Sequence, residues 1–354
     1  MTASGSTPRA ASREGSEPAR PTRRAVVRSG IGIGASLVAP AIASGASGRG
    51  MKFANIMPAG HPLNTRMGEA RDEIIKATDG RVDLQIFPAS QLGTDNSMLN
   101  QLRSGAIEFF AQSGLIVASL VPVAAISGIG FAFSNYDQVW RAMDGALGQY
   151  LIKALAKAGL VAFDRMWDNG FRQTTSWSKP IRTPDDLRGF KIRVPPSRLW
   201  TSLFENLGAS PTSIPWGETY SALQTHVADG LENPLAGVYF AKMYEVQKYL
   251  AMTNHMWDGF WFLANGRALD SLQPKDRDIV LKVVNEAAVR QRQDVQALNS
   301  QFSSSLREKG LEFVSVNSDL FRDKLGASQF YVEWKRRFGD EAWSILEQYS
   351  GSLG

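Results

Sequence analysis

The stretch RVDLQIF (residues 81–87) alternates apolar and polar side chains, so that Val82, Leu84 and Ile86 share one face, which predicts a half-buried β-strand. The segments around it continue the pattern: strand 52–57, helix 64–78, helix 95–104 and strand 107–112. Alternating strands and helices at this spacing are typical of parallel α/β layers. Because ligands of such layers bind beyond the carboxyl ends of the strands, we expect a site in the loops after these strands.

The middle of the chain repeats the alternation, which predicts a second α/β lobe. The expected elements are helix 136–158, strands 160–167, 174–176 and 191–194, a helix beginning at 184, and a strand at 261–265. Residues 275–306 keep helical spacing with polar residues between the apolar ones, which predicts a long helix or a broken pair of helices. The predicted fold class is therefore α/β with two lobes and long C-terminal helices.

The first 43 residues have the composition of an export signal. Arg23 and Arg24 precede an uncharged stretch, residues 29–43, which ends in the small-residue sequence AIA. We interpret residues 1–43 as a cleaved twin-arginine signal and residues 44–50 as a linker, with a Sec signal as the alternative. The uncharged stretch is too short for a permanent membrane anchor, which needs about 20 residues.

Charge and composition argue against several classes of protein. The 354 residues carry a net charge of +5, but residues 1–43 hold six arginines and two glutamates, which leaves 33 basic and 32 acidic residues beyond them. This nearly equal number of basic and acidic residues gives no indication of a nucleic-acid-binding face. The chain has no cysteine and no second long apolar run, so neither a disulfide, a lipid anchor nor a membrane-embedded domain is expected. We expect a soluble mature protein in the periplasm of a Gram-negative cell.

The sequence gives little support for an enzyme or a metal site, and no cofactor is expected. The three histidines lie far apart without the spacing of a helical zinc site, and cysteine nucleophiles are absent. The glycines of GIGIG (residues 30–34) lie inside the leader, so they do not form a phosphate-binding loop. A hydrolase or lyase that uses Asp168, Asp258 and an arginine is the enzymatic alternative.

Arg193 lies between Ile192 and Val194 in an otherwise apolar strand. An unpaired charge is costly to bury, so its guanidinium must either find a carboxylate within the protein or receive one from a ligand. From these residues alone, an internal salt bridge and a ligand site both stay open.

Eight motifs follow one another between residues 51 and 345: SQLG (90–93), GFRQT (170–174), GFKIRVP (189–195), GASPT (208–212), YSALQT (220–225), DGLENP (229–234), YEVQKY (244–249) and TNH (253–255). In this order they resemble the DctP-type solute-binding proteins of tripartite ATP-independent periplasmic (TRAP) transporters. The resemblance implies a two-lobed periplasmic-binding-protein fold with a hinge and a ligand cleft between the lobes. It places lobe 1 at residues 51–169 plus about 258–297, and lobe 2 at 170–257 plus about 298–354.

The resemblance also implies which residues bind the ligand. Arg193 matches the arginine that forks onto the ligand carboxylate, and Arg172 matches a second arginine that assists it. Asn233 matches an asparagine that contacts the same carboxylate or its neighbour. Trp216 matches an aromatic residue that packs on the ligand, with core packing as the alternative. The other candidates are Asp168, Trp257, Asp258, Gln112 and Ser113, of which the last two, with the loop 57–62, are expected to reach the ligand when the hinge closes.

The function implied by the resemblance is a periplasmic receptor that carries a small organic carboxylate to the membrane permease of a TRAP transporter, without catalysis. Sialic-acid binders of the family have charged pocket residues where this chain has Ser113 and Ile116, which argues against sialic acid. The many aromatic candidates, Trp167, Phe171, Trp216, Trp257, Phe260 and Trp261, favour an aromatic or branched 2-oxo or 2-hydroxy acid, with a uronic acid as the alternative. A ligand-sensing protein that serves a signalling kinase is a second alternative. A monomer is favoured over a dimer.

Overall fold

The computed structural model describes residues 49–353. The predicted export signal, residues 1–43, and the predicted linker up to residue 48 lie outside the described residues. Ten strands form one mixed sheet: β1 Arg49–Asn55, β2 Val82–Phe87, β3 Phe109–Ser113, β4 Leu160–Ala162, β5 Trp167–Ser176, β6 Lys191–Val194, β7 Ser210–Ser213, β8 Gly230–Pro234, β9 Tyr249–Asn265 and β10 Glu312–Val314. The predicted α/β class is confirmed.

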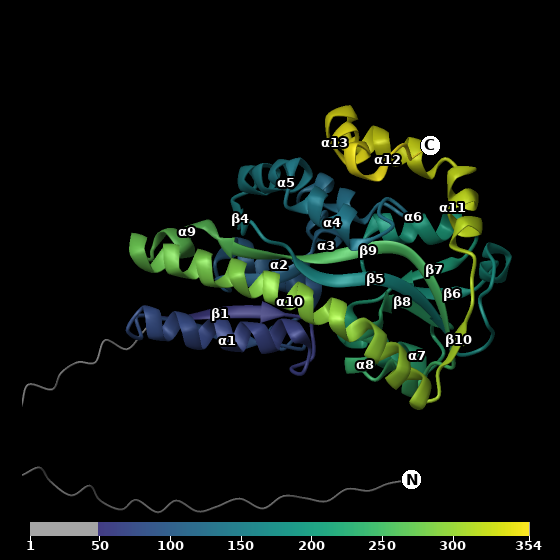
Figure 1. Ribbon diagram of the computed structural model, residues 1–354, viewed down its shortest axis with the longest axis horizontal. Helices are drawn as coiled ribbons and strands as arrows, with labels where there is room; N and C mark the ends of the chain where they lie inside the picture. Colours follow the sequence, from purple (N-terminus) through teal and green to yellow (C-terminus); the bar gives the residue numbers. More distant parts are fainter. Residues whose placement is uncertain (1–48, 354) are drawn as a thin grey trace, which may run out of the picture. The chain divides into compact units, whose positions relative to one another are not determined.

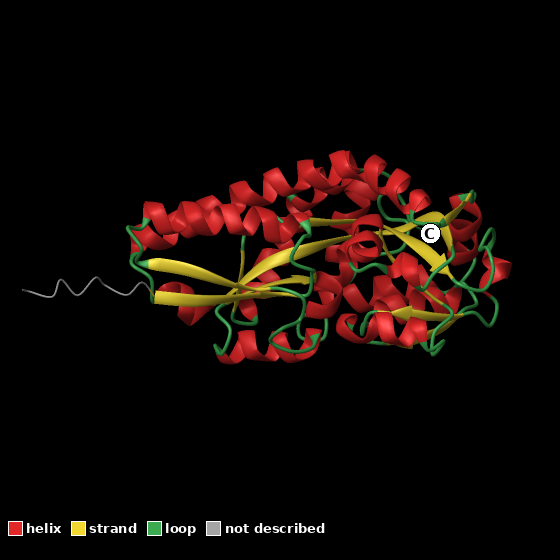
Figure 2. Cartoon of the chain, turned by 90° about the horizontal axis from the view of Figure 1, so that it is seen from below, coloured by secondary structure: helices red, strands yellow, loops and turns green. Residues whose placement is uncertain are grey.

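Helices cover both faces of this sheet (Figure 2). The α-helices are α1 Pro62–Ala77, α2 Asp95–Ser104, α3 Gly114–Val117, α4 Tyr136–Met143, α5 Ala146–Lys157, α6 Arg198–Asn206, α7 Thr219–Gln224, α8 Leu235–Phe240, α9 Gly266–Asp270, α10 Pro274–Glu308, α11 Ser318–Gly326, α12 Phe330–Phe338 and α13 Asp340–Ser350. Short 3₁₀ helices are η1 Pro122–Gly128, η2 Pro184–Leu187, η3 Trp216–Glu218 and η4 Met243–Glu245. The long α10 runs beside the sheet and packs on α1, β5 and α8 (Figure 1).

The order of strands brings two parallel sets into one sheet. The order is β2-β1-β3-β9-β5-β8-β6-β7, with β10 and β4 also paired to β9. Strands β1, β2 and β3 are parallel to one another, as are β6, β7 and β8. The pairs β3–β9, β9–β5 and β5–β8 are all antiparallel, so the two parallel sets run in opposite directions. Their carboxyl ends therefore face each other across the middle of the sheet.

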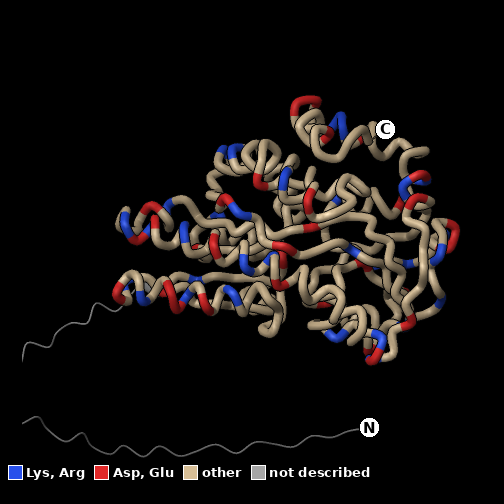
Figure 3. Tube along the Cα trace, in the orientation of Figure 1, with Lys and Arg blue, Asp and Glu red and all other residues tan. Residues whose placement is uncertain are grey.

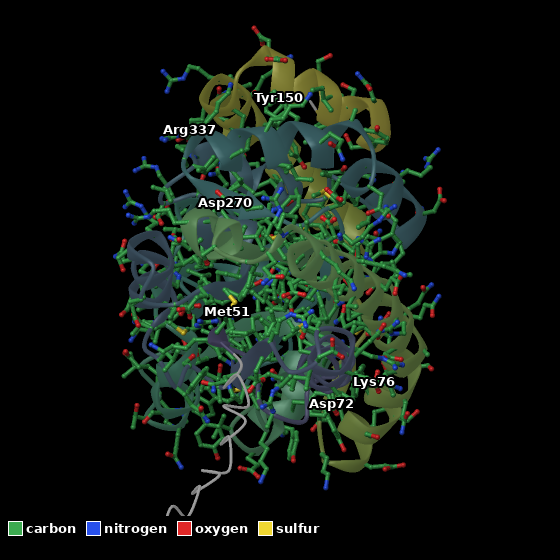
Figure 4. The ribbon with its side chains drawn as sticks, turned by 90° about the vertical axis from the view of Figure 1, so that its left-hand side faces the viewer. Met51, Asp72, Lys76, Tyr150, Asp270 and Arg337 are labelled. Carbon is green, nitrogen blue, oxygen red and sulfur yellow. The ribbon has the colours of Figure 1, made fainter. Side chains whose placement is uncertain are left out.

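Helix α1 illustrates how the sequence positions these layers. His61 caps its N-terminus by accepting from the Leu63 amide, and Pro62 occupies the first turn, where no amide donor is needed. One stripe of the helix is buried, while Asp72 and Lys76 are exposed. Figure 4 labels these two residues together with Met51 of the neighbouring β1, which is fully buried.

Several predicted elements have different limits in the structure. The helix expected at 136–158 is broken into α4 and α5 at Gly145, whose ψ of −146° is not helical. A side chain at this position would meet the Arg141 carbonyl at 2.3 Å, so the break requires a glycine. The strand expected at 160–167 divides between β4 and β5. The strand expected at 261–265 is the end of the 17-residue β9, whose first half carries buried polar residues that hide the strand pattern. The residues 275–306 lie in one 35-residue helix.

Charged residues of both signs are interspersed over the helices rather than gathered by sign (Figure 3). Among residues 49–353, no helix combines the length and apolar character that a membrane span requires. These residues belong to one compact unit. The division into lobes at the boundaries given above stays a prediction.

Candidate functional site

The carboxyl ends of strands from both parallel sets meet beside the middle of β9. Ser113, the last residue of β3, pairs with Phe260 of β9. Pro234, the last residue of β8, pairs with Arg172 of β5, which in turn pairs with Met256 of β9. The two strand ends therefore lie a few residues apart along β9, in the position where open α/β sheets bind ligands.

A small cavity lies at this meeting point, with a free volume of about 20 Å³. Its lining residues are Ile56, Met57, Asp95, Gln112, Ser113, Ile116, Asn169, Arg172, Arg193, Pro195, Trp200, Trp216, Asn233, Asp258 and Phe260. This volume is enough for about one water molecule, so an organic acid fits only if the predicted hinge opens. The structure brings together seven of the predicted site residues here: Arg193, Arg172, Asn233, Trp216, Asp258, Gln112 and Ser113. Their contact with a ligand stays a prediction.

Arg193 is a buried cation without a carboxylate partner among the described residues. Its side chain is 1% exposed and forms no ion pair within 49–353. Nε and Nη2 both donate to the Ile214 carbonyl, at 2.9 and 2.6 Å, while Nη1 has no partner. The guanidinium lies over the Trp216 ring, 5.5 Å from its centroid. Of the two alternatives that the sequence leaves open for Arg193, the described residues contain no internal salt bridge.

Arg172 has the opposite surroundings, because two buried carboxylates hold it. Its Nη2 donates to Glu232 Oε1 at 2.7 Å, and its Nε donates to the other oxygen of the same carboxylate. Its Nη1 donates to Asp258 Oδ2 at 3.1 Å. His255 Nε2 lies 3.2 Å from Glu232 Oε2. Arg172 is therefore already neutralised, whereas Arg193 is not.

The pKa values follow these surroundings. Burial lowers the pKa of Arg193 to about 10, and the charges of Glu232 and Asp95 only partly offset it. Burial acts in the same direction on Arg172, but Glu232 and Asp258 outweigh it and raise the pKa. For Glu232, burial would raise the pKa, yet Arg172 and His255 bring it below the ordinary value. Of the two arginines, Arg193 is thus the one whose charge is buried without compensation, and an anionic ligand would stabilise that charge.

Asn169 enters the cavity lining through an irregularity in β5. Asp168 pairs with Gly259 and Gly170 pairs with Asp258, so Asn169 is an extra residue without a partner on β9. Such a bulge changes the direction of a side chain relative to the regular alternation. Gly170 follows with a φ of 117°, which a glycine adopts without strain. The alternation of the sequence gives no sign of this extra residue, and Asn169 was not predicted.

Asp168 and Trp257, two predicted ligand contacts, do not line the cavity. They bond to each other, since Trp257 Nε1 donates to Asp168 Oδ1 at 2.9 Å. The main-chain N–H and C=O of Asp168 bond to the side-chain amide of Gln291 in α10, and the Trp257 ring packs edge-on against Trp140. The side chains of both residues are thus used inside the protein, between β5, β9 and α10.

The burial of Asp168 predicts a pH effect on stability. Burial raises its pKa to about 7, although the Trp257 indole acts to lower it. An unfolded aspartate has a pKa of about 4, so between about pH 4 and 7 the folded chain holds a proton that the unfolded chain releases. This contribution to stability is complete at the acid end and is lost as the pH rises towards 7. In urea unfolding, we expect the free energy of unfolding to fall less between pH 5 and pH 7 for Asp168→Asn than for the parent.

The exposed neighbour Asp164 provides the matched control, and Asp164→Asn should keep the parental pH dependence. If the free energy of unfolding changes equally with pH in Asp168→Asn and in the parent, the raised pKa of Asp168 is contradicted.

Asp95 and Trp200 line the cavity but were not predicted. Asp95, at the start of α2, accepts from Gln112 Nε2 at 3.1 Å and from the Trp216 amide at 3.3 Å. It thus joins the predicted lobe 1 to the predicted lobe 2. Trp200, in the first turn of α6, lies under the Arg172 guanidinium, 4.8 Å from its ring centroid. Its place in the helix that follows the Arg193 strand is the sequence signal that could have indicated it.

Fewer aromatic side chains line the cavity than the sequence predicts. Trp216 and Phe260 line the cavity, but four other aromatic candidates do not: Trp167, Phe171, Trp257 and Trp261. Apolar walls come also from Ile56, Met57, Ile116 and Pro195. Among residues 49–353, no group of three or more acidic or histidine side chains is placed to hold a metal ion.

Comparison with known proteins identifies the class that this fold and cavity define. The DctP family, described as bacterial extracellular solute-binding protein, family 7, matches residues 53–324. The 2,3-diketo-L-gulonate-binding periplasmic protein YiaO of Escherichia coli is 31% identical over 256 residues, 72% of this chain and 78% of YiaO. The C4-dicarboxylate-binding periplasmic protein DctP of Rhodobacter capsulatus is 30% identical over 241 residues, 67% of this chain and 71% of that protein.

A solved structure agrees with these relatives. The sugar acid binding protein DctPAm of Advenella mimigardefordensis, in complex with galactonate, superposes with a TM-score of 0.82 at 27% identity, covering 87% of this chain and 99% of that chain. The fold is therefore that of the two-lobed solute-binding proteins. The chain belongs to the DctP family of bacterial extracellular solute-binding proteins. Members of this family bind small acids and act as receptors of TRAP transporters rather than as enzymes.

Proposed function

We propose that this chain is a periplasmic receptor that binds a small organic monocarboxylate and delivers it to the membrane permease of a TRAP transporter. The observation that carries the proposal is Arg193, a guanidinium that is buried in the cavity lining with Nη1 unpaired. A ligand carboxylate supplies the missing charge, and a planar guanidinium suits a carboxylate better than an ammonium group does. Asn233 lines the same cavity and offers an amide beside it.

The cavity favours one carboxylate rather than two. Its buried charges are the cations Arg172 and Arg193 and the carboxylates Asp95, Asp258 and Glu232, of which Glu232 lies behind the lining. Arg193 is the one cation of this group without a carboxylate, so a second carboxylate on the ligand would meet acidic groups. Trp216, Phe260 and Ile116 give the cavity apolar walls, which suit an aromatic or branched ligand body.

A sugar acid such as a uronate is the second candidate. The relatives favour it, because YiaO is named as a 2,3-diketo-L-gulonate-binding protein and DctPAm as a sugar acid binding protein. The apolar residues of the lining argue against a sugar acid, because each buried ligand hydroxyl needs a hydrogen-bond partner.

The test is a thermal-shift and calorimetric screen of the mature chain, begun at Ser44. Aromatic and branched 2-oxo and 2-hydroxy acids, uronates, C4-dicarboxylates and sialic acid form the panel. We expect a small monocarboxylate to stabilise the chain, by about 2.7 kcal/mol at 100 times its Kd. A uronate that binds more tightly than every other class would favour the second candidate, and a panel without any binder would overturn the proposal.

A further inference from the structure

Unpartnered buried polar atoms concentrate at the cavity. Among the described residues, eight buried side-chain nitrogen or oxygen atoms have no hydrogen-bond partner. Three of them belong to cavity-lining residues: Arg193 Nη1, Asn169 Oδ1 and Trp200 Nε1. Buried polar groups are almost always paired in folded proteins, so a group left unpaired beside a cavity indicates which partner a ligand would supply.

The orientation of the Asn169 amide is set by its neighbour. Asn169 Nδ2 donates to Asp258 Oδ2 at 2.8 Å, and the same oxygen accepts from Arg172. Turning the amide over would place its oxygen against this carboxylate, which is unfavourable. The free atom is therefore Oδ1, which only accepts. It needs a donor on the ligand, and a carboxylate or a ketone oxygen offers none.

Trp200 Nε1 has the complementary requirement, because an indole N–H only donates. The Trp200 side chain is 1% exposed, so water does not satisfy the group from outside. A hydroxyl group is the smallest ligand group that meets both needs, since its oxygen accepts from Trp200 while its hydrogen is donated to Asn169. A ketone oxygen would meet the first need and leave Asn169 Oδ1 unpaired.

We propose that the cavity is specific for 2-hydroxy acids, with the carboxylate on Arg193 and the hydroxyl between Trp200 Nε1 and Asn169 Oδ1. Arg193, Trp200 and Asn169 line one small cavity, so the hydroxyl lies near the carboxylate, which favours position 2. This inference rests on the proposed function and narrows its ligand class. It assigns Trp200 and Asn169 as the residues that distinguish hydroxy acids from 2-oxo and unsubstituted acids.

The test compares acids that differ only at carbon 2. Calorimetry with the mature chain uses both enantiomers of 2-hydroxy-3-phenylpropanoate, with 2-oxo-3-phenylpropanoate and 3-phenylpropanoate. The same set is repeated on the smaller 3-methylbutanoate skeleton. Because each hydrogen bond contributes about 0.5–1.5 kcal/mol, we expect one 2-hydroxy enantiomer to bind roughly 5- to 100-fold more tightly than the unsubstituted acid, with the 2-oxo acid between them.

Two variants assign this preference to a residue. Trp200→Phe keeps the ring but removes the N–H, so it should reduce the ratio of hydroxy to unsubstituted affinity by about 3- to 10-fold and leave the unsubstituted acid unchanged. Trp216→Phe is the matched control, since it should weaken all the acids alike. Asn169→Ala should abolish the preference for the 2-hydroxy over the 2-oxo acid.

The outcomes separate this inference from the proposed function. Acids that bind with similar affinity whatever carbon 2 carries would overturn the inference alone, as would an unchanged ratio in Trp200→Phe. If neither skeleton nor any acid of the wider panel binds, the proposed function fails and the inference fails with it. The ligand comparison in the unaltered chain decides the matter even if a variant does not fold.

Discussion

We expect Arg193→Met to abolish high-affinity ligand binding while the protein stays folded. Removing one partner of a buried charge pair typically costs 2 to 5 kcal/mol, so the Kd for the tightest acid of the panel should rise by about 30-fold to several thousand-fold. The fold should tolerate the change, because Arg193 bonds only to the Ile214 carbonyl and no carboxylate loses a partner. We expect the free energy of unfolding without ligand to change by no more than about 1 kcal/mol.

The measurement is calorimetry with the panel acid, together with urea unfolding of the ligand-free chain. Arg198→Met, in the exposed first residue of α6, is the control and should alter neither quantity. An unaltered Kd in Arg193→Met would refute the role of this residue in binding. Loss of the folded state would show that Arg193 is structural after all.

Arg172→Met should destabilise the protein itself, by about 3 to 5 kcal/mol in urea unfolding. The substitution leaves the carboxylates of Glu232 and Asp258 buried without their cation. Arg172→Met and Arg193→Met should therefore differ in their effect on stability, although both arginines are almost fully buried and line the same cavity.

Glu232→Gln in the same chain supplies the internal check. The double variant no longer buries the charge of Glu232, so it should be more stable than Arg172→Met alone. Arg188→Met breaks the exposed pair with Asp185 and should change stability by less than about 1 kcal/mol. If Arg172→Met is as mild as Arg188→Met, the buried network around Glu232 does not contribute as the distances suggest.

Much of the fold was predictable because local patterns agree with it. Helix α2 and strand β6 have the limits that the sequence predicts, since Thr94 and Gly105 mark the two ends of α2, and Gly189 and Pro195 flank β6. Strand β9 was recognised only at its end, because a strand that carries buried His255 and Asp258 lacks the apolar alternation of an ordinary strand. Such a strand is stable only when other chain segments pair its polar groups.

The candidate site was predictable to the extent that its residue types are unusual for their surroundings. An arginine within an apolar strand is recognisable anywhere, and family motifs add Arg172, Asn233 and Trp216. Asp168 and Trp257 stand beside these motifs in sequence but lie outside the cavity, since neighbours along a strand point to opposite faces. Proximity in sequence was a poor guide for these two residues.

The sequence by itself determined the α/β class, the family and the presence of a buried arginine that needs an anion. It did so because hydrophobic period, turn residues and unusual buried charges are properties of single segments. Tertiary structure alone decided which arginine is free. Glu232 and Asp258 reach Arg172 from two other strands, and His255 contacts Glu232. The Asn169 bulge arises from the register between β5 and β9. A pairing between distant segments has no local signature, so only the folded arrangement separates the neutralised Arg172 from the unpaired Arg193.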